Sequence, residues 1–229
     1  MRLPPDLVAG SMLGRTSRFT VDVEVDGKPV RAHVANSGRI LELLQPGLRA
    51  LLRPVEPNGR ATAYDLVLVR TAGGWVSADA RLPNRLIEEA LAAGRLDGFR
   101  GYTDAKREAR LGGSRIDFLL SGPAGTCFLE AKSVTLVQEG VAFFPDCRTA
   151  RGARQLRLMA GAACAGRDAA IVFVVQRGDV RALRPWDAAD PDFGRALREA
   201  AAAGVRVAAY RCDVSPCAVE LDGQVPVLL

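Results

Sequence analysis

Two acidic residues and one lysine are the side chains in this sequence with the clearest potential for chemistry. Asp117, Glu130 and Lys132 lie in two apolar stretches separated by a short segment rich in Gly and Pro. Hard divalent cations prefer carboxylate oxygens, and one or two carboxylates plus water usually hold Mg²⁺. An ammonium group beside such a cation can orient a water nucleophile or stabilise charge on a phosphate. These residue types therefore predict a Mg²⁺ or Mn²⁺ site, to which the Ala131 carbonyl could add a ligand.

The spacing of these residues predicts that they meet across a β-hairpin. If the connecting segment forms a symmetric loop, Leu120 pairs with Cys127, and counting back along both strands sets Asp117 opposite Glu130. Opposed side chains have Cβ atoms about 4.5–5.5 Å apart, so two carboxylates there repel each other and a cation would stabilise them. Lys132 shares the face of Glu130 because side chains alternate along a strand.

An ordinary structural role is the alternative interpretation of these residues. Glu130 and Lys132 would then be a solvated pair on one strand face, with Asp117 an unremarkable edge residue. The neighbouring side chains argue for the metal site, because a charge inside a buried strand needs a partner or an ion. The large apolar neighbours that make both strands look buried are Phe118, Leu120, Phe128 and Leu129.

The first third of the sequence predicts a small β-barrel. Apolar and polar residues alternate on both sides of Asp26-Gly27, a dipeptide typical of hairpin turns. Three further β-rich segments follow, separated by Pro and Gly turns. The OB-fold is the commonest nucleic-acid-binding barrel of this size. We expect its strands near residues 19–25, 30–34, 48–55, 62–71 and 75–78.

The rest of the chain predicts an α/β domain. Asn84 can cap a helix that runs from Arg85 to Ala93 and stops at Gly94. Strands and helices follow, with strands near 115–120, 127–132, 169–175 and 205–210 and helices near 149–165 and 192–203. We therefore place the barrel in residues 1–80 and the α/β domain in residues 81–229, an α+β fold overall.

Composition narrows the class of protein. With 48% hydrophobic and 25% charged residues, the 229-residue chain is typical of a globular protein. A net charge of +5 favours an acidic partner such as nucleic acid. No apolar run approaches the roughly 20 residues that span a bilayer, and no leader is recognisable, so we expect a cytoplasmic protein without a membrane partner. The five cysteines are scattered without a C-x-x-C pair, which favours reduced thiols.

Several segments together resemble one known family. Residues 115–120 (RIDFLL) and 129–136 (LEAKSVTL) are similar to the signature of the sugar fermentation stimulation protein A family. The similarity covers nearly the whole chain, and its other matching segments are 33–39 (HVANSGR), 82–86 (LPNRL), 144–146 (FPD) and 151–152 (RG). The resemblance implies an OB-like N-terminal domain, a C-terminal domain of the PD-(D/E)XK nuclease type, and DNA binding.

The resemblance also implies supporting acidic residues. Glu89 in the first helix and Glu108 before the Asp117 strand match acidic positions that such domains use beside the metal. The alternatives are a helix-dipole partner for Glu89 and an exposed charge for Glu108. The family pattern places a His where this chain has Gln155. Because Gln can donate a hydrogen bond but cannot act as an acid near neutral pH, we expect Gln155 to contact a phosphate without transferring a proton.

Basic residues supply candidate contacts to the nucleic-acid backbone. Those at 148, 151, 154 and 157 recur every three residues and predict a ridge along one helix, although a solvated helix face is the alternative for each. In the barrel, the Gly-containing turn 36–39 could bring N–H groups toward a phosphate. His33 is expected to pack within its strand. The candidate contacts are Asn36, Ser37, Gly38, Arg39, Arg18, Lys28, Arg148, Arg151, Arg154 and Gln155.

The sequence thus predicts a DNA-binding protein with a metal-dependent nuclease site. A non-catalytic DNA-binding regulator of sugar-utilisation genes that kept the nuclease fold is the alternative. RNA is a second option for the polymer, because an OB-like barrel binds either one. A homodimer is one option for assembly, and the sequence does not decide it.

Overall fold

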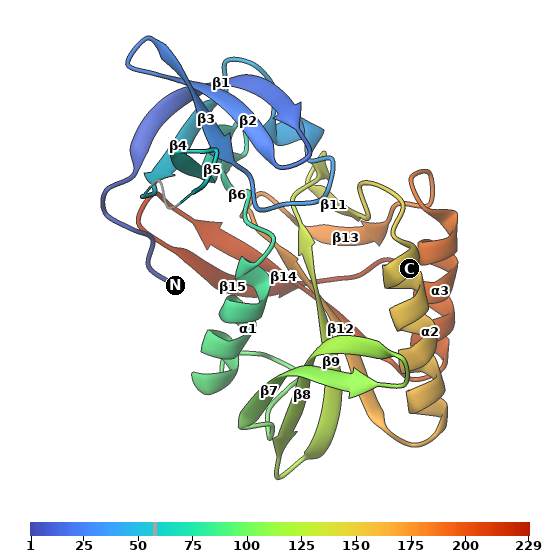
Figure 1. The fold of residues 1–229 in the computed structure, drawn as a ribbon. Coiled ribbons are helices and arrows are strands. Elements are labelled where there is room, and N and C mark those ends of the chain that lie inside the picture. The colour runs from blue at the N-terminus through green and yellow to red at the C-terminus, as the bar shows by residue number, and fades with distance from the viewer. Residues whose placement is uncertain (57–58) are drawn as a thin grey trace.

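The structure is a computed structural model that describes residues 1–56 and 59–229. An N-terminal barrel, drawn in blue and teal, sits at one end of a larger unit that contains a twisted sheet and three helices (Figure 1). This arrangement confirms the predicted fold class, an OB-like β-barrel followed by an α/β domain. No helix among the described residues is both long enough and apolar enough to cross a membrane.

Five strands close the barrel. They pair in the order β3-β2-β1-β4-β5, and a parallel pairing between β3 and β5 completes the circle. A sixth strand, β6, extends the sheet beyond β5. Apolar side chains on alternate positions point inward because the strand period is two, and Val21 and Val23 are fully buried. The bounds are β1 Val8–Ser17, β2 Thr20–Val25, β3 Lys28–His33, β4 Arg49–Pro54, β5 Tyr64–Thr71 and β6 Gly74–Ser77, with a short 3-10 helix, η1, at Leu41–Leu43.

The barrel strands agree with the prediction in part. The hairpin between β2 and β3 turns at Asp26 and Gly27, both with positive φ, as the dipeptide predicts. Strand β1 was not predicted, because Gly10, Gly14 and several polar residues hide its alternation and only Met12 in it is fully buried. The predicted strand at 75–78 corresponds to β6, which lies outside the closed barrel.

The second unit is built on a six-stranded mixed sheet in the order β15-β14-β12-β9-β8-β7. A three-stranded sheet of β10, β11 and β13 lies beside it. The strands are β7 Asp104–Leu111, β8 Ser114–Gly122, β9 Gly125–Val134, β10 Val137–Gln138, β11 Val141–Phe144, β12 Asp168–Val175, β13 Ala182–Pro185, β14 Arg206–Val214 and β15 Val219–Val225. The helices are α1 Leu82–Ala92, α2 Ala150–Cys164 and α3 Pro191–Ala202.

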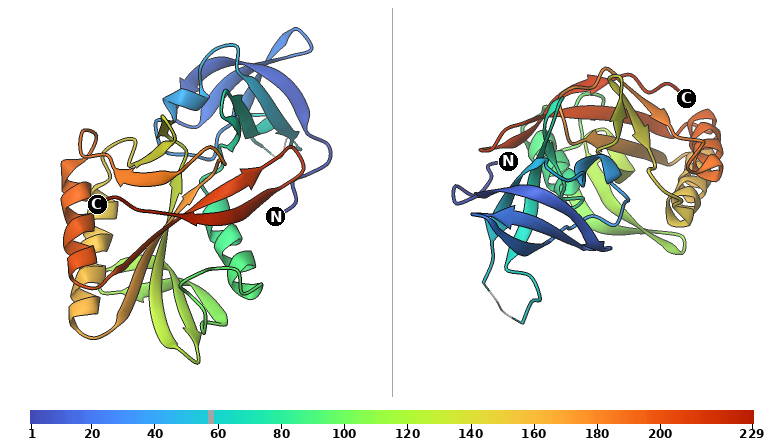
Figure 2. Two further views of the ribbon diagram at one scale, coloured as in Figure 1. Left: turned by 180° about the vertical axis from the view of Figure 1, so that it is seen from behind. Right: turned by 90° about the horizontal axis from the view of Figure 1, so that it is seen from above.

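Helices cover both faces of this sheet. Helices α2 and α3 lie side by side on one face, and α1 lies on the other (Figures 1 and 2). The first face buries Leu156 of α2 and Phe193 of α3 against strand residues such as Phe173. The second buries Leu86 of α1 against residues such as Phe118. Because strand β9 is central and covered on both faces, any charged group on it is removed from water.

Helix α1 begins earlier than predicted, so the expectation that Asn84 caps it was wrong. The helix starts at Leu82, and Asn84 lies within its first turn. Arg81 takes the cap position without a side-chain cap hydrogen bond. Asp79 holds the turn just before it: its Oδ1 accepts a hydrogen bond from the Arg81 N–H at 2.9 Å, and its carbonyl accepts one from the Leu82 N–H at 3.2 Å. Pro83 fits the first turn because it has no N–H to satisfy there.

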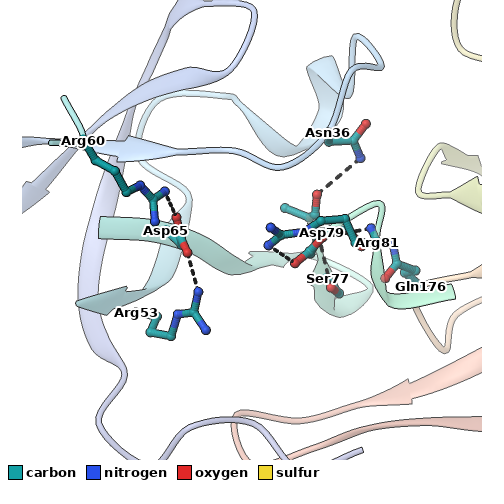
Figure 3. A network of polar contacts seen from close by, with 9 residues as sticks. Asn36, Arg53, Arg60, Asp65, Ser77, Asp79, Arg81 and Gln176 are labelled. Atoms are coloured by element: carbon teal, nitrogen blue, oxygen red, sulfur yellow. Dashed lines mark hydrogen bonds and ion pairs between the residues drawn. The ribbon is translucent and has the colours of Figure 1, made fainter. Parts of the chain in front are cut away.

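The segment that joins the barrel to α1 is held from both sides (Figure 3). The Ser77 N–H donates to the Gln176 carbonyl at 3.1 Å, and the Gln176 side chain donates to the Asp79 carbonyl at 3.1 Å. From the barrel, the Asn36 side chain donates to the Ala78 carbonyl at 3.3 Å. Arg81 and Asp79 form a two-pronged ion pair beside these contacts. The predicted boundary near residue 80 falls in this segment.

Arg177 makes the second set of contacts between the two units. Its guanidinium donates to the Thr135 carbonyl at 3.1 Å and to both carboxylate oxygens of Asp179 at 2.6 and 2.7 Å, and it reaches Thr71 of the barrel at 3.5 Å. The Thr135 hydroxyl donates to Glu42 of η1 at 2.8 Å, and burial raises the pKa of Glu42. This polar interface, together with the joining segment, fixes the barrel against the second unit.

The first residues of the chain lie on the second unit. The Leu3 N–H donates to the Cys217 carbonyl at 2.8 Å, and the Val219 N–H donates to the Met1 carbonyl at 3.0 Å. The predicted barrel span of 1–80 therefore includes a segment that contacts the β14–β15 hairpin before the chain enters β1.

Candidate metal centre and adjoining cleft

The β8–β9 hairpin has the predicted register. Leu120 pairs with Cys127, and pairing continues back to Phe118 and Leu129. Beyond that point the side chains of Asp117 and Glu130 replace backbone partners. The Asp117 N–H donates to Glu130 Oε2 at 3.2 Å, and the Ala131 N–H donates to Asp117 Oδ2 at 2.9 Å. The two carboxylates thus meet across the hairpin, each held by an N–H group of the opposite strand.

Lys132 completes the predicted trio. Its ammonium donates to Glu130 Oε1 at 2.6 Å and to Gln155 Oε1 of helix α2 at 3.1 Å. Gln155 is 1% exposed, and its amide nitrogen donates in turn to the Arg115 carbonyl at 3.1 Å. Gln155 therefore orients the lysine from behind and does not face a ligand, contrary to the expectation that it contacts a phosphate.

The electrostatics of the pair leave room for a cation. Glu130 is 4% exposed, and its burial raises the pKa of its carboxyl; Lys132 lowers that pKa, while the charge of Asp117 raises it further. Asp117 is half-buried. A site with two adjacent carboxylates and one ammonium keeps a net negative charge, and two carboxylates plus water is a donor set that suits Mg²⁺ or Mn²⁺. The residues present therefore fit a hard divalent cation.

Asn84 is a site residue that the sequence analysis assigned to another role. From the first turn of α1, its side-chain nitrogen donates to Asp117 Oδ1 at 3.3 Å. Because the Ala131 N–H donates to Oδ2, both oxygens of Asp117 accept hydrogen bonds and the carboxylate is fixed in orientation. The sequence did contain an indication, because Asn84 lies inside the 82–86 segment that carries the family resemblance.

The two additional acidic residues behave differently from the trio. Glu108 lies opposite Asp117 in the register of β7 and β8, but it has a φ of 58°, is exposed, and pairs with Arg115 at 3.3 Å. Glu89 lies on another face of α1, where it pairs with the amino group of Met1 at 2.9 Å. The structure therefore brings neither side chain into contact with Asp117 or Glu130.

A cleft of about 500 Å³ adjoins the trio and runs between the barrel and the second unit. Ala131 and Lys132 line it on the side of the acidic pair. The described residues around it carry four basic side chains and a single carboxylate, that of Asp146, whose Oδ2 is engaged by the Ile40 N–H at 2.8 Å. The predicted nucleic-acid contacts that line this cleft are Arg18, Asn36, Ser37, Gly38, Arg148 and Arg151.

The arginines around the cleft lack acidic partners. Among the described residues, no carboxylate lies within ion-pair distance of Arg18, Arg148 or Arg151, whereas many other arginines of the chain have one. Arg154 is exposed one turn further along α2, outside the cleft lining. Arg157 pairs with Asp192 of α3 at 2.5 Å, so the predicted ridge ends before it.

The turn at 36–39 uses its backbone differently from the prediction. The Gly38 N–H donates to Asn36 Oδ1 at 2.9 Å, so that N–H does not point at a ligand. A Cβ on Gly38 would lie 2.8 Å from Asp146 Oδ2, which explains the glycine. Neither Arg39 nor Lys28 is among the residues that line the cleft.

Comparison with known proteins places both units in one family. Residues 13–78 match the domain described as the SfsA N-terminal OB domain, and residues 81–218 match the Sugar fermentation stimulation protein RE domain. The sugar fermentation stimulation protein homolog of Moorella thermoacetica is 47% identical over 231 residues, covering 100% of each chain. The homolog of Chloroflexus aurantiacus is 47% identical over 221 residues, covering 96% of this chain and 85% of that one.

A solved structure shows the same fold along the whole chain. The structure of Pyrococcus furiosus SfsA in complex with Ca²⁺ superposes with a TM-score of 0.91 at 30% sequence identity. The superposition covers 100% of this chain and 98% of that one. Both the barrel and the second unit therefore have counterparts in that protein.

Proposed function

The chain belongs to the sugar fermentation stimulation protein family, and from that premise we propose that it is a DNA-binding protein with a divalent-metal-dependent phosphodiesterase site. One observation carries the proposal: Asp117, Glu130 and Lys132 meet at the edge of a cleft whose arginines have no acidic partner in the described part of the chain. Carboxylates for a cation and guanidinium groups for phosphates thus lie side by side. RNA is the alternative polymer.

Asp117 and Glu130 would hold Mg²⁺ or Mn²⁺. The carbonyl of Ala131, the residue after Glu130 on strand β9, would add a ligand. The relative from Pyrococcus furiosus was solved with Ca²⁺, another hard cation that takes oxygen ligands. When bound, such a cation supplies Lewis acidity and lowers the pKa of a coordinated water. Asn84 and the Ala131 N–H keep the Asp117 carboxylate in a fixed orientation, so little conformational entropy is lost on binding.

Lys132 would act on the phosphate or on the attacking water. Its side chain is 12% exposed, and its ammonium is held between Glu130 and Gln155, which fixes its position. A positive charge in this partly dry position stabilises the charge that develops on a phosphate more strongly than it would in water. Gln155 cannot ionise, so it positions Lys132 and takes no part in proton transfer.

The test is cleavage by a variant that removes one carboxylate charge. Asp117→Asn should abolish Mg²⁺- or Mn²⁺-dependent cleavage while DNA binding measured in EDTA stays intact. Asp104→Asn, an exposed aspartate on β7 of the same sheet, is the matched control and should cleave like the wild type. The assay should compare single- and double-stranded DNA and RNA. Undiminished cleavage by Asp117→Asn would overturn the assignment.

A non-catalytic DNA-binding regulator is the second candidate, and one observation favours it. The Lys132 ammonium already neutralises Glu130 at 2.6 Å, and the described residues contain no group of three or more metal-ligating side chains. Calorimetric titration with Mg²⁺ and Mn²⁺ separates the candidates. Binding at up to millimolar concentration that is lost in Asp117→Asn supports the phosphodiesterase, and the absence of binding in the wild type supports the regulator.

A further inference from the structure

An exposed aromatic ring stands at the edge of the cleft. Phe19 lies in the turn between β1 and β2 and is 43% exposed, so its ring is not needed to fill the barrel core. The Arg18 guanidinium lies over that ring, 5.3 Å from its centre. Arg18 lines the cleft, and Phe19 follows it just outside the lining. An aromatic face and a cation therefore occupy the same point of the cleft edge.

His33 supports the ring from behind. Its imidazole is stacked with the Phe19 ring, with centroids 6.2 Å apart and an angle of 17° between the planes. The predicted packing of His33 within its strand holds, since it is half-buried in β3. The stacking turns one flat face of the Phe19 ring toward His33, and 43% of the residue stays exposed to a ligand. Flat, sequence-tolerant surfaces of this kind are what single-stranded nucleic acids stack on.

Arg15 holds the hairpin tip and the cleft turn together. Its guanidinium donates to the carbonyls of Arg18 and Ser17 in the tip, and to those of Asn36, Gly38 and Arg39 in the turn. These five contacts join the two loops into one rigid surface. The position of Phe19 relative to the cleft is therefore set before a ligand arrives, which reduces the entropy lost on binding.

The size of the cleft suits one strand. A volume of about 500 Å³ lies in the range of pockets that enclose a molecule of drug size, which is comparable to one or two nucleotides. In a duplex the flat faces of the bases are covered by their neighbours, so only an unpaired base can stack on Phe19.

We propose that Phe19 is a stacking subsite for one base of an unpaired nucleic-acid strand. The phosphates of that strand follow the cleft past Arg148 and Arg151 to Lys132. The inference deepens the proposed function and rests on it for the role of the Lys132 end, and it makes single-stranded nucleic acid, or a frayed end, the substrate class. Phe19 is a binding residue in this scheme and takes no part in the chemistry.

The test measures binding of the full-length protein in EDTA, by fluorescence anisotropy, to a labelled oligodeoxythymidine and to a duplex of equal length. Phe19→Ala should weaken binding of the single strand about tenfold, since one base–aromatic stack is typically worth about that factor. Its affinity for the duplex should be unchanged. Phe19→Trp should restore single-strand binding because it keeps a flat ring.

Leu13→Ala is the matched control. Leu13 is an apolar residue of the same barrel with the same 43% exposure. Its chain neighbours Met12 and Gly14 do not line the cleft, whereas Phe19 follows Arg18, which does. Wild-type affinity in Leu13→Ala, with unchanged thermal unfolding of both alanine variants, supports the subsite. The subsite is overturned if Phe19→Ala binds the single strand normally, if both polymers lose affinity equally, or if the wild type binds only duplex.

The outcome is separable from that of the proposed function. If Asp117→Asn abolishes cleavage but Phe19→Ala binds normally, the phosphodiesterase stands and the subsite falls. If Phe19→Ala loses single-strand binding but no metal-dependent cleavage is found in the wild type, the subsite stands as a binding surface and the phosphodiesterase falls.

Discussion

The junction between the two units and the cleft beside it both depend on arginine, but in different ways. At the junction, Arg177 faces Asp179 and Arg81 faces Asp79, each in a two-pronged ion pair. In the cleft, Arg148 and Arg151 have no such partner among the described residues. A guanidinium matched by a carboxylate holds the fold, whereas an unmatched one in a concave surface is free to bind an anion.

Removal of Arg177 should have the largest effect. Its side chain is 7% exposed, so Arg177→Ala leaves the Asp179 carboxylate and the Thr135 carbonyl without their donor and opens a space at the junction. We expect a loss of about 3 kcal/mol in the free energy of unfolding, measured with urea. Arg198→Ala is the control: Arg198 forms a similar two-pronged pair with Asp187, but both side chains are exposed, so its loss should be below about 1 kcal/mol. Equal losses would contradict the comparison.

Removal of the cleft arginines should act on binding and not on folding. The double variant Arg148→Gln, Arg151→Gln should weaken single-stranded DNA binding about tenfold at physiological salt, because two phosphates lose their counter-charges. The slope of log affinity against log salt should fall by about 1.4. The free energy of unfolding should change by less than about 0.5 kcal/mol. Arg157→Gln, Arg195→Gln removes two arginines that pair with Asp192 and should leave the slope nearly unchanged.

The smallest effect concerns acid stability of the barrel. Burial of Asp65 acts to raise its pKa, but hydrogen bonds from Arg60 and Arg53 outweigh it and hold the pKa below its usual value. A depressed carboxyl pKa contributes stability that is present above the unfolded pKa of about 3.9 and is lost as pH falls through the folded pKa.

Asp65→Asn should therefore cost about 1 kcal/mol at pH 7. The difference from the wild type should shrink from about pH 5 downward, as the wild-type carboxylate takes up its proton. Urea unfolding at pH 7 and pH 3 measures both values. A difference that persists undiminished at pH 3 would show that the charge of Asp65 is not what stabilises the barrel.

Local rules predicted the register of the candidate metal site. A symmetric loop and strict alternation sufficed to set Asp117 against Glu130, because hairpin pairing depends only on residues near in sequence. The position of α1 depended on more distant contacts. Because the helix starts at Leu82, Asn84 lies in its first turn and contacts Asp117, whereas Glu89, which the family resemblance placed in the site, pairs with Met1.

The cleft could not be predicted from sequence patterns. It depends on how the barrel sits on the second unit, and that placement is set by contacts such as Ile40 with Asp146 and Thr135 with Glu42, which lie about a hundred residues apart along the chain. The recurrence of arginine every three residues along α2 predicted a ridge. Only the tertiary structure separates Arg151, which lines the cleft, from Arg157, which pairs with Asp192.

The contact of the first residues with the β14–β15 hairpin bears on how the chain folds during synthesis. The barrel can close once β5 has left the ribosome, because its five strands end at Thr71. Leu3 can bind its partner only after Cys217 has been synthesised, and Met1 only after Val219 has been synthesised. The order of synthesis therefore allows the barrel to fold while the leading segment is still free, and that segment can dock only when the last strands of the second unit have been made.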